Sequence, residues 1–513
     1  MSIATKIFSL IFKEKLVRLD ECRRRPDLFQ REWFERLIAA GAGSHFAIEH
    51  GLSLKTTLRE FRQLVPLRNY DALEPFIERV RRGEDNVLTT APVNWFARSS
   101  GTSSSKSKFI PITADSLKYC HISGMKNMLA TYISQNPHSK IFDGDALTLG
   151  GSVTLDDMGQ GRARCGDLSA VLLKNSPRWI EMVRVPKRRI ALMPDFEKKV
   201  EAICREAHRY DVTNFSGVPS WNMVLIRAIL QHTGKANLLE IWPNLELFMH
   251  GGINFEPYKE EYCSLIPSPL MHYMENYNAS EGYFAFQDDS ADMAQLLMVD
   301  NGIFYEFIPV DKLEDAIEGK FVEFDTVETV KKGVNYAMVI TTNGGLWRYL
   351  IGDSVQFTSL QPHKIVITGR TQLYINTFGE ELMVNNTERA LAAASEKHGA
   401  NVENYTVAPI FMRNGSKGSH QWLIEFSTMP DDIGAFTRTL DGEISKLNSD
   451  YEAKRRNNST MEMPTVTPLK KGTFYVWMKK QGKLGGQNKV PRLYQNRVYV
   501  EQLLEIDNEG ADI

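Results

Sequence analysis

The sequence predicts an α/β protein with a large N-terminal body and a small C-terminal α+β domain. Short runs rich in β-branched and aromatic residues, such as Tyr336–Thr341, alternate with helical patterns such as Val218–Gln231. Strands interleaved with helices are typical of an α/β body covered on its faces. After Gly369 the pattern changes to a compact series of helices and strands of ordinary domain size. We therefore expect one domain over residues 1–370 and a second over 371–513.

The body begins with helices. Met1–Asp20 has apolar residues at helical spacing, interrupted by charges, which indicates an amphipathic helix and excludes a signal peptide. Asp27–Ala40 and Leu54–Leu64 show the same spacing, with proline and glycine at their ends. The later strands are expected at Asn94–Ala97, Lys108–Ile112, Ala146–Leu149, Leu296–Val299 and Tyr336–Thr341, and the helices at Ala114–Ser134, Phe196–Tyr210 and Val218–Gln231.

The C-terminal domain is predicted from the same two periodicities. Its elements alternate between apolar residues at helical spacing and short β-rich runs. They are helix Thr387–His398, strand Tyr405–Met412, strand Gln421–Phe426, helix Ile433–Arg455 and strand Phe474–Met478.

The charge balance narrows the class of partner. The chain has 61 basic and 63 acidic side chains, so no net field favours nucleic acid or an anionic membrane. No uncharged apolar stretch approaches the roughly 20 residues that a bilayer requires. We expect a cytoplasmic protein that acts on small molecules, and a monomer, because no heptad pattern is present.

The metal-binding residue types are scattered. Five cysteines and 11 histidines occur without a CxxC pair or an HExxH motif. The cysteines are therefore expected to be reduced structural thiols, and we do not expect a zinc-dependent hydrolase.

A polar segment between two predicted strands is the strongest local candidate for a phosphate site. The segment from Ser99 to Lys108 combines many hydroxyls, one glycine and two lysines with no carboxylate. These groups supply the donors that a polyphosphate accepts. The segment is not a Walker A loop, because the GxxxxGK[ST] spacing is absent and a strand follows. Taken alone, it is equally compatible with a serine-rich turn.

Further segments carry polar groups next to predicted strands. Gly251-Gly252 allows the backbone to approach a flat ligand closely, and Tyr277 offers a ring to stack on it. Glu281 offers oxygen to a hard cation. Asp353 can accept both hydroxyls of a ribose, and Arg370 can bind ribose or phosphate. The alternative interpretations are a tight turn, a surface carboxylate and a capping aspartate.

In this chain order, the segments resemble those of the adenylate-forming superfamily. That superfamily has a Ser/Thr/Gly/Lys phosphate loop, a Gly-Gly turn, a Tyr-x-x-[ST]-Glu segment, a Tyr-Arg-x-x-Gly-Asp segment and a Gly-Arg hinge. The chain is more similar still to the acyl acid-amido synthetases of the Gretchen Hagen Three family and their bacterial relatives. Plant members of that family conjugate auxin, jasmonate or benzoates to amino acids. The motifs that carry the similarity are Trp95–Thr102, Gly166–Ala170 and Asn488–Arg492.

The resemblance covers nearly the whole chain and implies a fold and a role for each segment. The body would contain β-sheets and a barrel flanked by helices, and the C-terminal domain would be mobile. Tyr277 would pack on adenine, Asp353 and Arg370 would hold ribose and α-phosphate, and Glu281 would bind Mg²⁺. Lys489 matches the lysine that such enzymes place on the developing acyl phosphate. The implied ATP site comprises Ser99, Ser100, Gly101, Thr102, Ser103, Gly251, Gly252, Tyr277, Asn278, Ala279, Ser280, Asp353 and Arg370, with Lys108 and Lys489 catalytic.

The resemblance also implies where the acid substrate binds. The family lines its acid pocket with the helix after the phosphate loop, here Ala114–Ser134, and with the segment Gly217–Ser220. His121, Met125 and Val218 are the candidates, although a core role is the commoner fate of a methionine.

The implied reaction has two steps. A carboxylic acid attacks the α-phosphorus of Mg·ATP and expels pyrophosphate, and an amine, in this family an amino acid, then attacks the acyl-adenylate and releases AMP. No activated serine or cysteine is needed, in agreement with the lack of a Gly-x-Ser-x-Gly elbow. Two alternatives remain open at this point: an acyl-CoA synthetase that shares the first step, and a non-catalytic nucleotide-binding protein.

Overall fold

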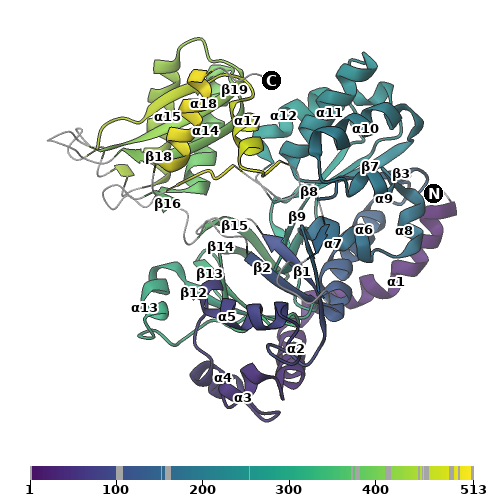
Figure 1. Cartoon of the computed structure of the whole chain (residues 1–513), viewed down its shortest axis with the longest axis vertical. Helices are drawn as coiled ribbons and strands as arrows, with labels where there is room; N and C mark the ends of the chain where they lie inside the picture. The colour runs from purple at the N-terminus through teal and green to yellow at the C-terminus, as the bar shows by residue number, and fades with distance from the viewer. Residues whose placement is uncertain are drawn as a thin grey trace. The chain divides into compact units, whose positions relative to one another are not determined.

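The computed structural model describes residues 3–99, 108–151, 153–155, 163–252, 255–370, 374–375, 382–410, 418–448, 451–452, 455, 461–484, 490–494 and 497–509 (Figure 1). The chain forms two compact units. Unit 1 comprises Met1–Ile253 and Cys263–Ile367, and unit 2 comprises Asn254–Tyr262 and Thr368–Ile513. The division predicted from the sequence, between residues 370 and 371, lies close to the last of the three junctions, whereas Asn254–Tyr262, predicted in the first domain, belongs to unit 2.

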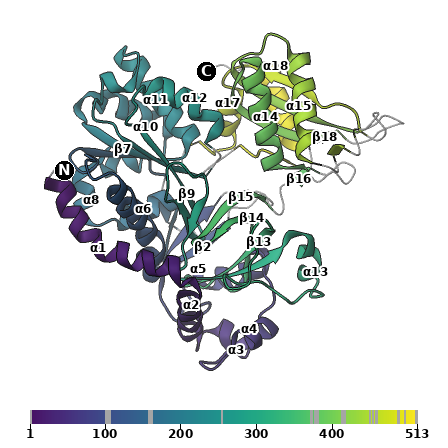
Figure 2. The same ribbon diagram turned by 180° about the vertical axis from the view of Figure 1, so that it is seen from behind.

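Unit 1 begins with a helical layer. Helix α1 is longer than the sequence pattern predicts, and it lies along α6 in both ribbon views (Figures 1 and 2). Its inner face buries Phe12 and Leu19, and Phe8 stacks on Phe142 with ring centroids 3.8 Å apart. Ile11 is one of the apolar residues at helical spacing in Met1–Asp20, but it is 59% exposed and does not belong to the buried face, so its predicted place on that face was wrong. The helices of this layer are α1 (Ile3–Arg24), α2 (Pro26–Gly41), α3 (His45–Glu49), α4 (Leu58–Leu64) and α5 (Tyr70–Arg81).

The start of α4 corrects the predicted helix Leu54–Leu64. The Thr57 hydroxyl accepts a hydrogen bond from the Glu60 amide, and the Glu60 carboxylate accepts one from the Thr57 amide at 2.8 Å. Because of this capping box the helix begins at Leu58. The amides of Thr57 and Glu60 have no carbonyl partner in a preceding helical turn, and the two side chains accept their hydrogen bonds instead.

Eleven strands form one mixed sheet in the described part of the chain. From β6 to β9 the neighbouring strands run parallel, and beyond β9 the recorded pairs are antiparallel. In sheet order the strands are β12 (Ile303–Pro309), β13 (Asn335–Thr342), β14 (Tyr349–Leu360), β15 (His363–Arg370), β11 (Gln295–Leu297), β10 (Gly282–Gln287), β9 (His272–Ala279), β8 (Leu247–Gly251), β7 (Val212–Gly217), β3 (Asp145–Thr148) and β6 (Arg184–Val185).

Helices connect the parallel strands, as parallel pairing requires. The connection from β7 to β8 contains α11, and the stretch before β7 contains α10. Both confirm helices expected from the sequence. The α- and π-helices that follow α5 up to β13 are η1 (Ser116–His121), α6 (Ile122–Gln135), α7 (Leu168–Asn175), α8 (Arg178–Val183), α9 (Arg188–Ala191), α10 (Phe196–Glu206), α11 (Pro219–Thr233), α12 (Glu256–Leu265) and α13 (Leu313–Ile317).

A smaller sheet holds the ends of the predicted phosphate loop. Strand β1 (Val93–Ser99) pairs antiparallel with β2 (Lys108–Thr113), with Ser99 opposite Lys108. The sheet order is β2-β1-β5-β4, where β4 is Val153–Leu155 and β5 is Arg164–Gly166. After β2, Ala114 and Asp115 are α-helical and the π-helix η1 follows, so the predicted helix Ala114–Ser134 is interrupted by η1 before α6.

Unit 2 has its own core around a sheet that, over the described residues, runs β18-β19-β20. Helices α14 and α15 pack side by side on it (Figure 1). The elements are β16 (Tyr374–Ile375), β17 (Leu382–Met383), α14 (Val384–His398), β18 (Asn401–Ile410), β19 (Ser419–Thr428), α15 (Ile433–Leu447), β20 (Thr465–Leu469), α17 (Thr473–Lys480) and α18 (Val498–Glu509).

Two predictions for unit 2 were wrong. Phe474–Met478 is not a strand but part of helix α17, in which Phe474, Trp477 and Met478 are buried at helical spacing. The aromatic and β-branched run favours a strand locally, and core packing overrides that preference. Helix α15 ends at Leu447 and not at Arg455, because Asn448 leaves the helical conformation with ψ of 107°.

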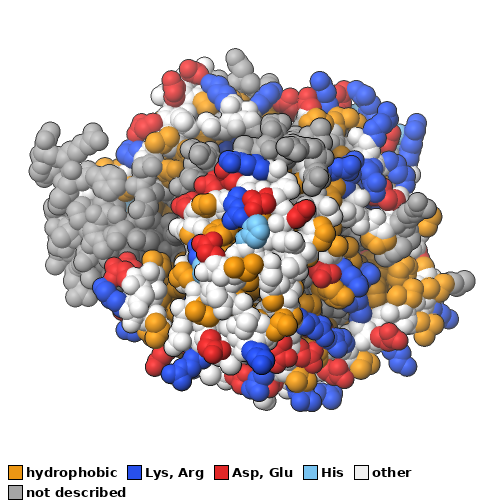
Figure 3. Space-filling view, turned by 60° about the horizontal axis from the view of Figure 1, so that its bottom comes forward, with side chains coloured by type: hydrophobic (Ala, Val, Ile, Leu, Met, Phe, Trp, Pro, Cys, Tyr) orange, Lys and Arg blue, Asp and Glu red, His pale blue; other side chains and the backbone are white. Residues whose placement is uncertain are grey.

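The surface agrees with the balanced charge. Acidic and basic side chains are interspersed over the described residues of the face in Figure 3. Within the described segments, no helix combines the length and the apolar character needed to cross a bilayer. Cys22, Cys120, Cys165 and Cys204 are buried thiols that form no disulfide, and Cys263 is exposed.

Candidate active site

The carboxyl ends of the parallel strands β7 and β8 gather several predicted residues. Gly217 pairs with His250 there, so Val218 follows β7 beside the Gly251-Gly252 turn. A side chain at Gly251 would place its Cβ 2.3 Å from the Asn276 carbonyl oxygen, and Gly252 has φ of +83°. Both glycines are therefore required by the backbone. Ligands of α/β sheets bind outside such strand ends.

The tyrosine and aspartate of two separate motifs meet in unit 1. The Tyr277 hydroxyl donates a hydrogen bond to the Asp353 carboxylate, with 2.5 Å between the oxygens, and both side chains are buried. Four strand spacings separate β9 from β14, about 19 Å in a flat sheet. The sheet must therefore curl strongly to let these side chains touch. This curl brings together residues that are 76 positions apart in the sequence.

The predicted pocket histidine meets the next residue of the same strand. His121 Nδ1 and Asn278 Oδ1 lie 3.1 Å apart. Because a carboxamide oxygen only accepts hydrogen bonds, Nδ1 carries the proton and Nε2 is the acceptor. Burial lowers the pKa of His121 to about 4, so the ring is neutral near pH 7. A neutral imidazole of fixed tautomer thus adjoins the segment predicted to hold the nucleotide.

The π-helix η1 gives His121 this position. The Cys120 Sγ, one residue earlier, accepts a hydrogen bond from the Tyr283 amide at 3.1 Å, which fastens η1 to β10. Gly124 then allows α6 to lie directly on the Tyr283 ring, since an added Cβ would come within 2.3 Å of it. Met125 follows on α6 and is half-buried. Single-turn π-helices occur often at functional sites, which makes η1 a relevant local signal.

The predicted phosphate loop is described only at its ends. Lys108 begins β2, with its ammonium 5.8 Å from the centre of the Tyr70 ring. The Tyr70 hydroxyl accepts a hydrogen bond from the Phe109 amide at 2.8 Å, which holds this end of the hairpin. Ser99 is paired through its backbone, and the predicted residues Ser100, Gly101, Thr102 and Ser103 lie outside the described residues.

The proposed metal ligand lies at a strand connection. Ser280 and Glu281 are the two residues between β9 and β10, where Ala279 pairs with Gly282. Ser280 is buried and Glu281 is half-buried. Over the described residues, no three His, Cys, Asp or Glu side chains gather as a metal site. A single carboxylate with substrate phosphates is nevertheless a common Mg²⁺ environment, and Glu281 fits that arrangement.

Arg348, five residues before Asp353, is a residue for which the sequence predicted no role. Arg348 is 2% exposed and binds the Glu306 carboxylate at 2.9 Å. It also donates to the Val65 carbonyl oxygen at 2.7 Å and has φ of +42°. An unusual backbone conformation held by buried partners is typical of a positioning role. Arg348 thus fixes the start of the strand that carries Asp353.

The last motif lies in unit 2 and is described from Val490 onward, so Lys489 lies outside the described residues. Arg492, to which the sequence motif assigned no role, is a half-buried anchor. Its guanidinium stacks over the Tyr405 ring at 4.7 Å and approaches the Tyr258 hydroxyl at 3.2 Å. The backbone also pairs with β18, since the Val407 amide donates to the Arg492 carbonyl. These contacts hold the chain that follows Lys489. Arg370, at the end of β15, is described only by its backbone.

Comparison with known proteins identifies the family. The model of the GH3 (Gretchen Hagen Three) family N-terminal domain matches residues 15–271, which is half of the chain. The chain belongs to the GH3 family. The GH3 central domain matches residues 296–370 and the GH3 C-terminal domain matches 385–498. The GH3 resemblance expected from the sequence motifs is therefore confirmed.

Two plant relatives of this GH3 chain cover much of its length. Indole-3-acetic acid-amido synthetase GH3.8 of Oryza sativa subsp. indica is 23% identical, covering 93% of this chain and 90% of the rice protein. Jasmonoyl–L-amino acid synthetase JAR4 of Nicotiana attenuata is 21% identical, covering 64% and 66%.

Solved structures share the fold of this GH3 chain. GH3.15 acyl acid amido synthetase superposes with a TM-score of 0.78 at 17% identity, covering 97% of this chain and 95% of that one. A 2-hydroxyisobutyryl-CoA ligase in the postadenylation state gives 0.57 at 13% identity, covering 94% and 92%. The predicted adenylate-forming fold, a large α/β body followed by a smaller domain, is confirmed.

Proposed function

We propose that this GH3 protein is an ATP-dependent ligase that adenylates a carboxylic acid and joins the acyl group to an amino acid. The observation that carries the proposal is the buried hydrogen bond between Tyr277 and Asp353. It joins the segment expected at adenine to the carboxylate expected at ribose, two groups that a nucleotide would contact together. Relatives named as amido synthetases for indole-3-acetic acid and jasmonate support an amino acid as the acceptor.

The residues of the chain would divide the work. The Ser99–Lys108 loop and the Gly251-Gly252 turn would bind and orient the phosphates and the base. Asp353 and Arg370 would hold the ribose and α-phosphate, and Lys489 would supply a cation to the phosphoryl oxygens. Catalysis would then come from positioning and electrostatic stabilisation. Mg²⁺, when bound beside Glu281, would neutralise phosphate charge.

The acid would bind next to the nucleotide. His121 lies against the Asn278 side chain, and Val218 follows the strand that pairs with β8. Both positions adjoin the Gly251–Asn278 region, which supports their place in the acyl pocket together with the half-buried Met125. A neutral His121 carries no charge that would hold a carboxylate away from the α-phosphorus.

The acceptor assay tests the proposal. The protein is incubated with ATP, a panel of aromatic and aliphatic acids, and either amino acids or CoA, and AMP formation is measured. We expect amino acids to increase AMP formation with at least one acid. A rise with CoA alone would identify an acyl-CoA synthetase, and no pyrophosphate release with any acid would favour a non-catalytic nucleotide-binding protein.

The proposal extends to location and assembly. A reaction that consumes ATP and amino acids suits the cytoplasm, and one chain supplies every residue assigned above, so a monomer is sufficient. Size-exclusion chromatography with light scattering tests the monomer; a stable dimer at working concentration would contradict it.

A further inference from the structure

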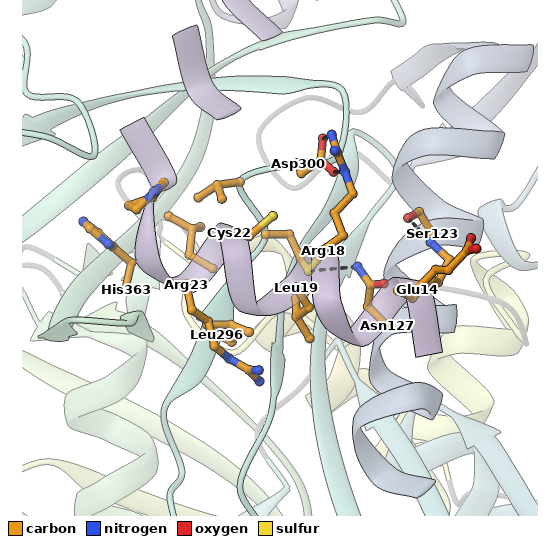
Figure 4. A pocket seen from close by; sticks show the side chains of 15 residues that line it. Glu14, Arg18, Leu19, Cys22, Arg23, Ser123, Asn127, Leu296, Asp300 and His363 are labelled. Carbon is orange, nitrogen blue, oxygen red and sulfur yellow. Dashed lines mark hydrogen bonds and ion pairs between the residues drawn. The ribbon is translucent and has the colours of Figure 1, made fainter. Parts of the chain in front are cut away.

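A cavity of about 310 Å³ lies in unit 1 between α1, α6 and β11. None of the predicted site residues lines it. In Figure 4 the cavity runs along α1, and the polar side chains Arg18, Arg23, Asn127 and Asp300 lie along its length. His363 lies at one end, Glu14 and Ser123 lie at the other, and Leu19, Cys22 and Leu296 lie between them.

Apolar side chains form one wall of the cavity between its ends. Leu19 and Cys22 of α1 face Leu296–Val299 of β11 and the following residues. Burial raises the pKa of the Cys22 thiol to about 12, so this side chain is neutral and adds to the apolar wall. Such a wall favours the hydrocarbon part of a ligand, at roughly 25 cal/mol per Å² removed from water.

Among the described residues lining the cavity, Arg18, Arg23 and Asp300 are in ion pairs, whereas Lys15 and the exposed Glu14 are not. Arg18 binds Asp300 at 2.6 Å, and Arg23 binds Asp288 at 3.0 Å. The Lys15 ammonium donates to the Ser123 hydroxyl at 3.1 Å, and no described carboxylate forms an ion pair with it. Burial lowers the pKa of Lys15 because the ammonium loses water there. The Asp300 carboxylate lies near enough to oppose this shift but is bound to Arg18, so a half-buried cation whose hydrogen-bond partner is neutral favours an anion.

On the His363 side of the cavity the cation is Arg23, and two carboxylates, Asp20 at 2.7 Å and Asp288 at 3.0 Å, already bind it. His363 donates its Nε2 proton to the Val327 carbonyl oxygen at 2.7 Å, and burial lowers the pKa of the ring. Its Nδ1 is therefore an acceptor. Glu14 is exposed, so water screens its charge more than that of a buried group. Among the described residues that line the cavity, Lys15 is thus the cation without an ion pair, and apolar side chains lie next to it.

We propose that this cavity is a second ligand site, for a small carboxylate with a hydrocarbon body. The carboxylate would bind Lys15 and Ser123, and the hydrocarbon would lie against Leu19 and Cys22. The volume lies at the lower end of the range for small-molecule sites, about 300–1,000 Å³. The site would be separate from the acid pocket of the proposed function, so it stands whether or not the protein is a ligase.

Equilibrium dialysis of the full chain without ATP tests the site. Octanoate is the probe, and octanamide is the neutral match of the same length. We expect Lys15→Met to weaken octanoate binding at least tenfold, since a charge-assisted bond is lost. Lys13→Met, an exposed lysine of the same helix that does not line the cavity, is expected to bind like the wild type. Equal binding by Lys15→Met, or tighter binding of octanamide, overturns the proposal.

Alkylation of the wild-type chain gives a second reading that needs no variant. Iodoacetamide is applied at pH 9, and each cysteine is followed by mass spectrometry. Octanoate is expected to slow the reaction of Cys22 several-fold and to leave exposed Cys263 unchanged. If a concentration that saturates the dialysis signal leaves Cys22 as reactive as before, the ligand binds elsewhere and the proposal fails.

Discussion

The Tyr277 hydroxyl is the side-chain group on which the proposed nucleotide site depends. It fixes the carboxylate of Asp353, and the burial of both side chains limits alternative orientations. A hydrogen bond to a charged group contributes about 1.5–3 kcal/mol to stability, compared with about 0.5–1.5 kcal/mol for a typical hydrogen bond within a protein. The orientation of Asp353 is therefore set before any ligand arrives.

Tyr277→Phe tests this preorganisation. Without the hydroxyl, the Asp353 carboxylate turns more freely, and we expect the KM for ATP to rise about tenfold, or about 1.4 kcal/mol. Pyrophosphate release at varied ATP measures it. Tyr336→Phe, which also removes a tyrosine hydroxyl from unit 1, is the matched control and is expected to leave KM unchanged. Similar effects of both changes would contradict the assignment.

His121 predicts a pH dependence of stability. Its pKa falls from 6.5 to about 4 on folding, so between these values the unfolded chain binds a proton that the folded chain does not. Falling pH therefore lowers the free energy of unfolding from pH 6.5 down to pH 4. His121→Asn keeps a donor near Asn278 and removes the titration. Between pH 7 and 4.5, urea unfolding should show the wild type losing about 2–3 kcal/mol more than this variant. Equal losses would place the titration elsewhere.

Lys489 carries the chemical prediction. If its ammonium meets charge that develops on the phosphoryl oxygens, Lys489→Ala slows adenylation far more than it weakens ATP binding. Single-turnover adenylation and ATP binding are measured separately, with Lys483→Ala as a nearby control in the same unit. Equal losses in rate and affinity would reject the role.

Among the elements, α6 illustrates how packing decides a helix. Its residue Gly124 admits the Tyr283 ring of β10, whereas Gly442 of α15 has open space around it. We expect Gly124→Ala to lower the free energy of unfolding by about 1–3 kcal/mol through overpacking. Gly442→Ala should raise it by about 0.5–1 kcal/mol, because alanine restricts the unfolded chain and favours the helix. Chemical denaturation measures both, and a loss at Gly442 equal to that at Gly124 would contradict the packing argument.

The local sequence pattern predicts whether a segment is a helix or a strand, but it does not predict which distant residues come into contact. The spacing in Asp27–Ala40 predicts α2 within one residue at each end, because the apolar stripe and its punctuation are local. The aromatic run in α17 misleads, because its burial depends on distant partners. His121 and Asn278 are both named by the sequence, yet their bond joins residues 157 positions apart and depends on the π-turn of η1. No periodicity within either segment contains that information.

At the scale of the whole molecule, the GH3 resemblance places the movable joint near Thr371. A domain that closes for adenylation and turns for amide formation needs backbone freedom at the joint. Thr371→Pro restricts that freedom, so we expect acyl-adenylate formation and amide formation to lose their coupling. Burst and steady-state AMP release measure the two steps. If Thr371→Pro leaves both rates unchanged, the joint lies elsewhere, and Thr371→Ala controls for the lost hydroxyl.

Unit 2 takes nine residues, Asn254–Tyr262, from the middle of the chain. Tyr258 in that stretch contacts the Arg492 guanidinium and the Glu403 carbonyl oxygen. Cutting the chain at one position therefore cannot yield both units intact. A fragment that starts at Thr368 lacks Tyr258, and the other fragment retains Asn254–Tyr262 without the unit that these residues belong to. The two units are joined at three positions, after Ile253, Tyr262 and Ile367, so gene fission or circular permutation at any one of them would not separate the units. We therefore expect the two units to be inherited together.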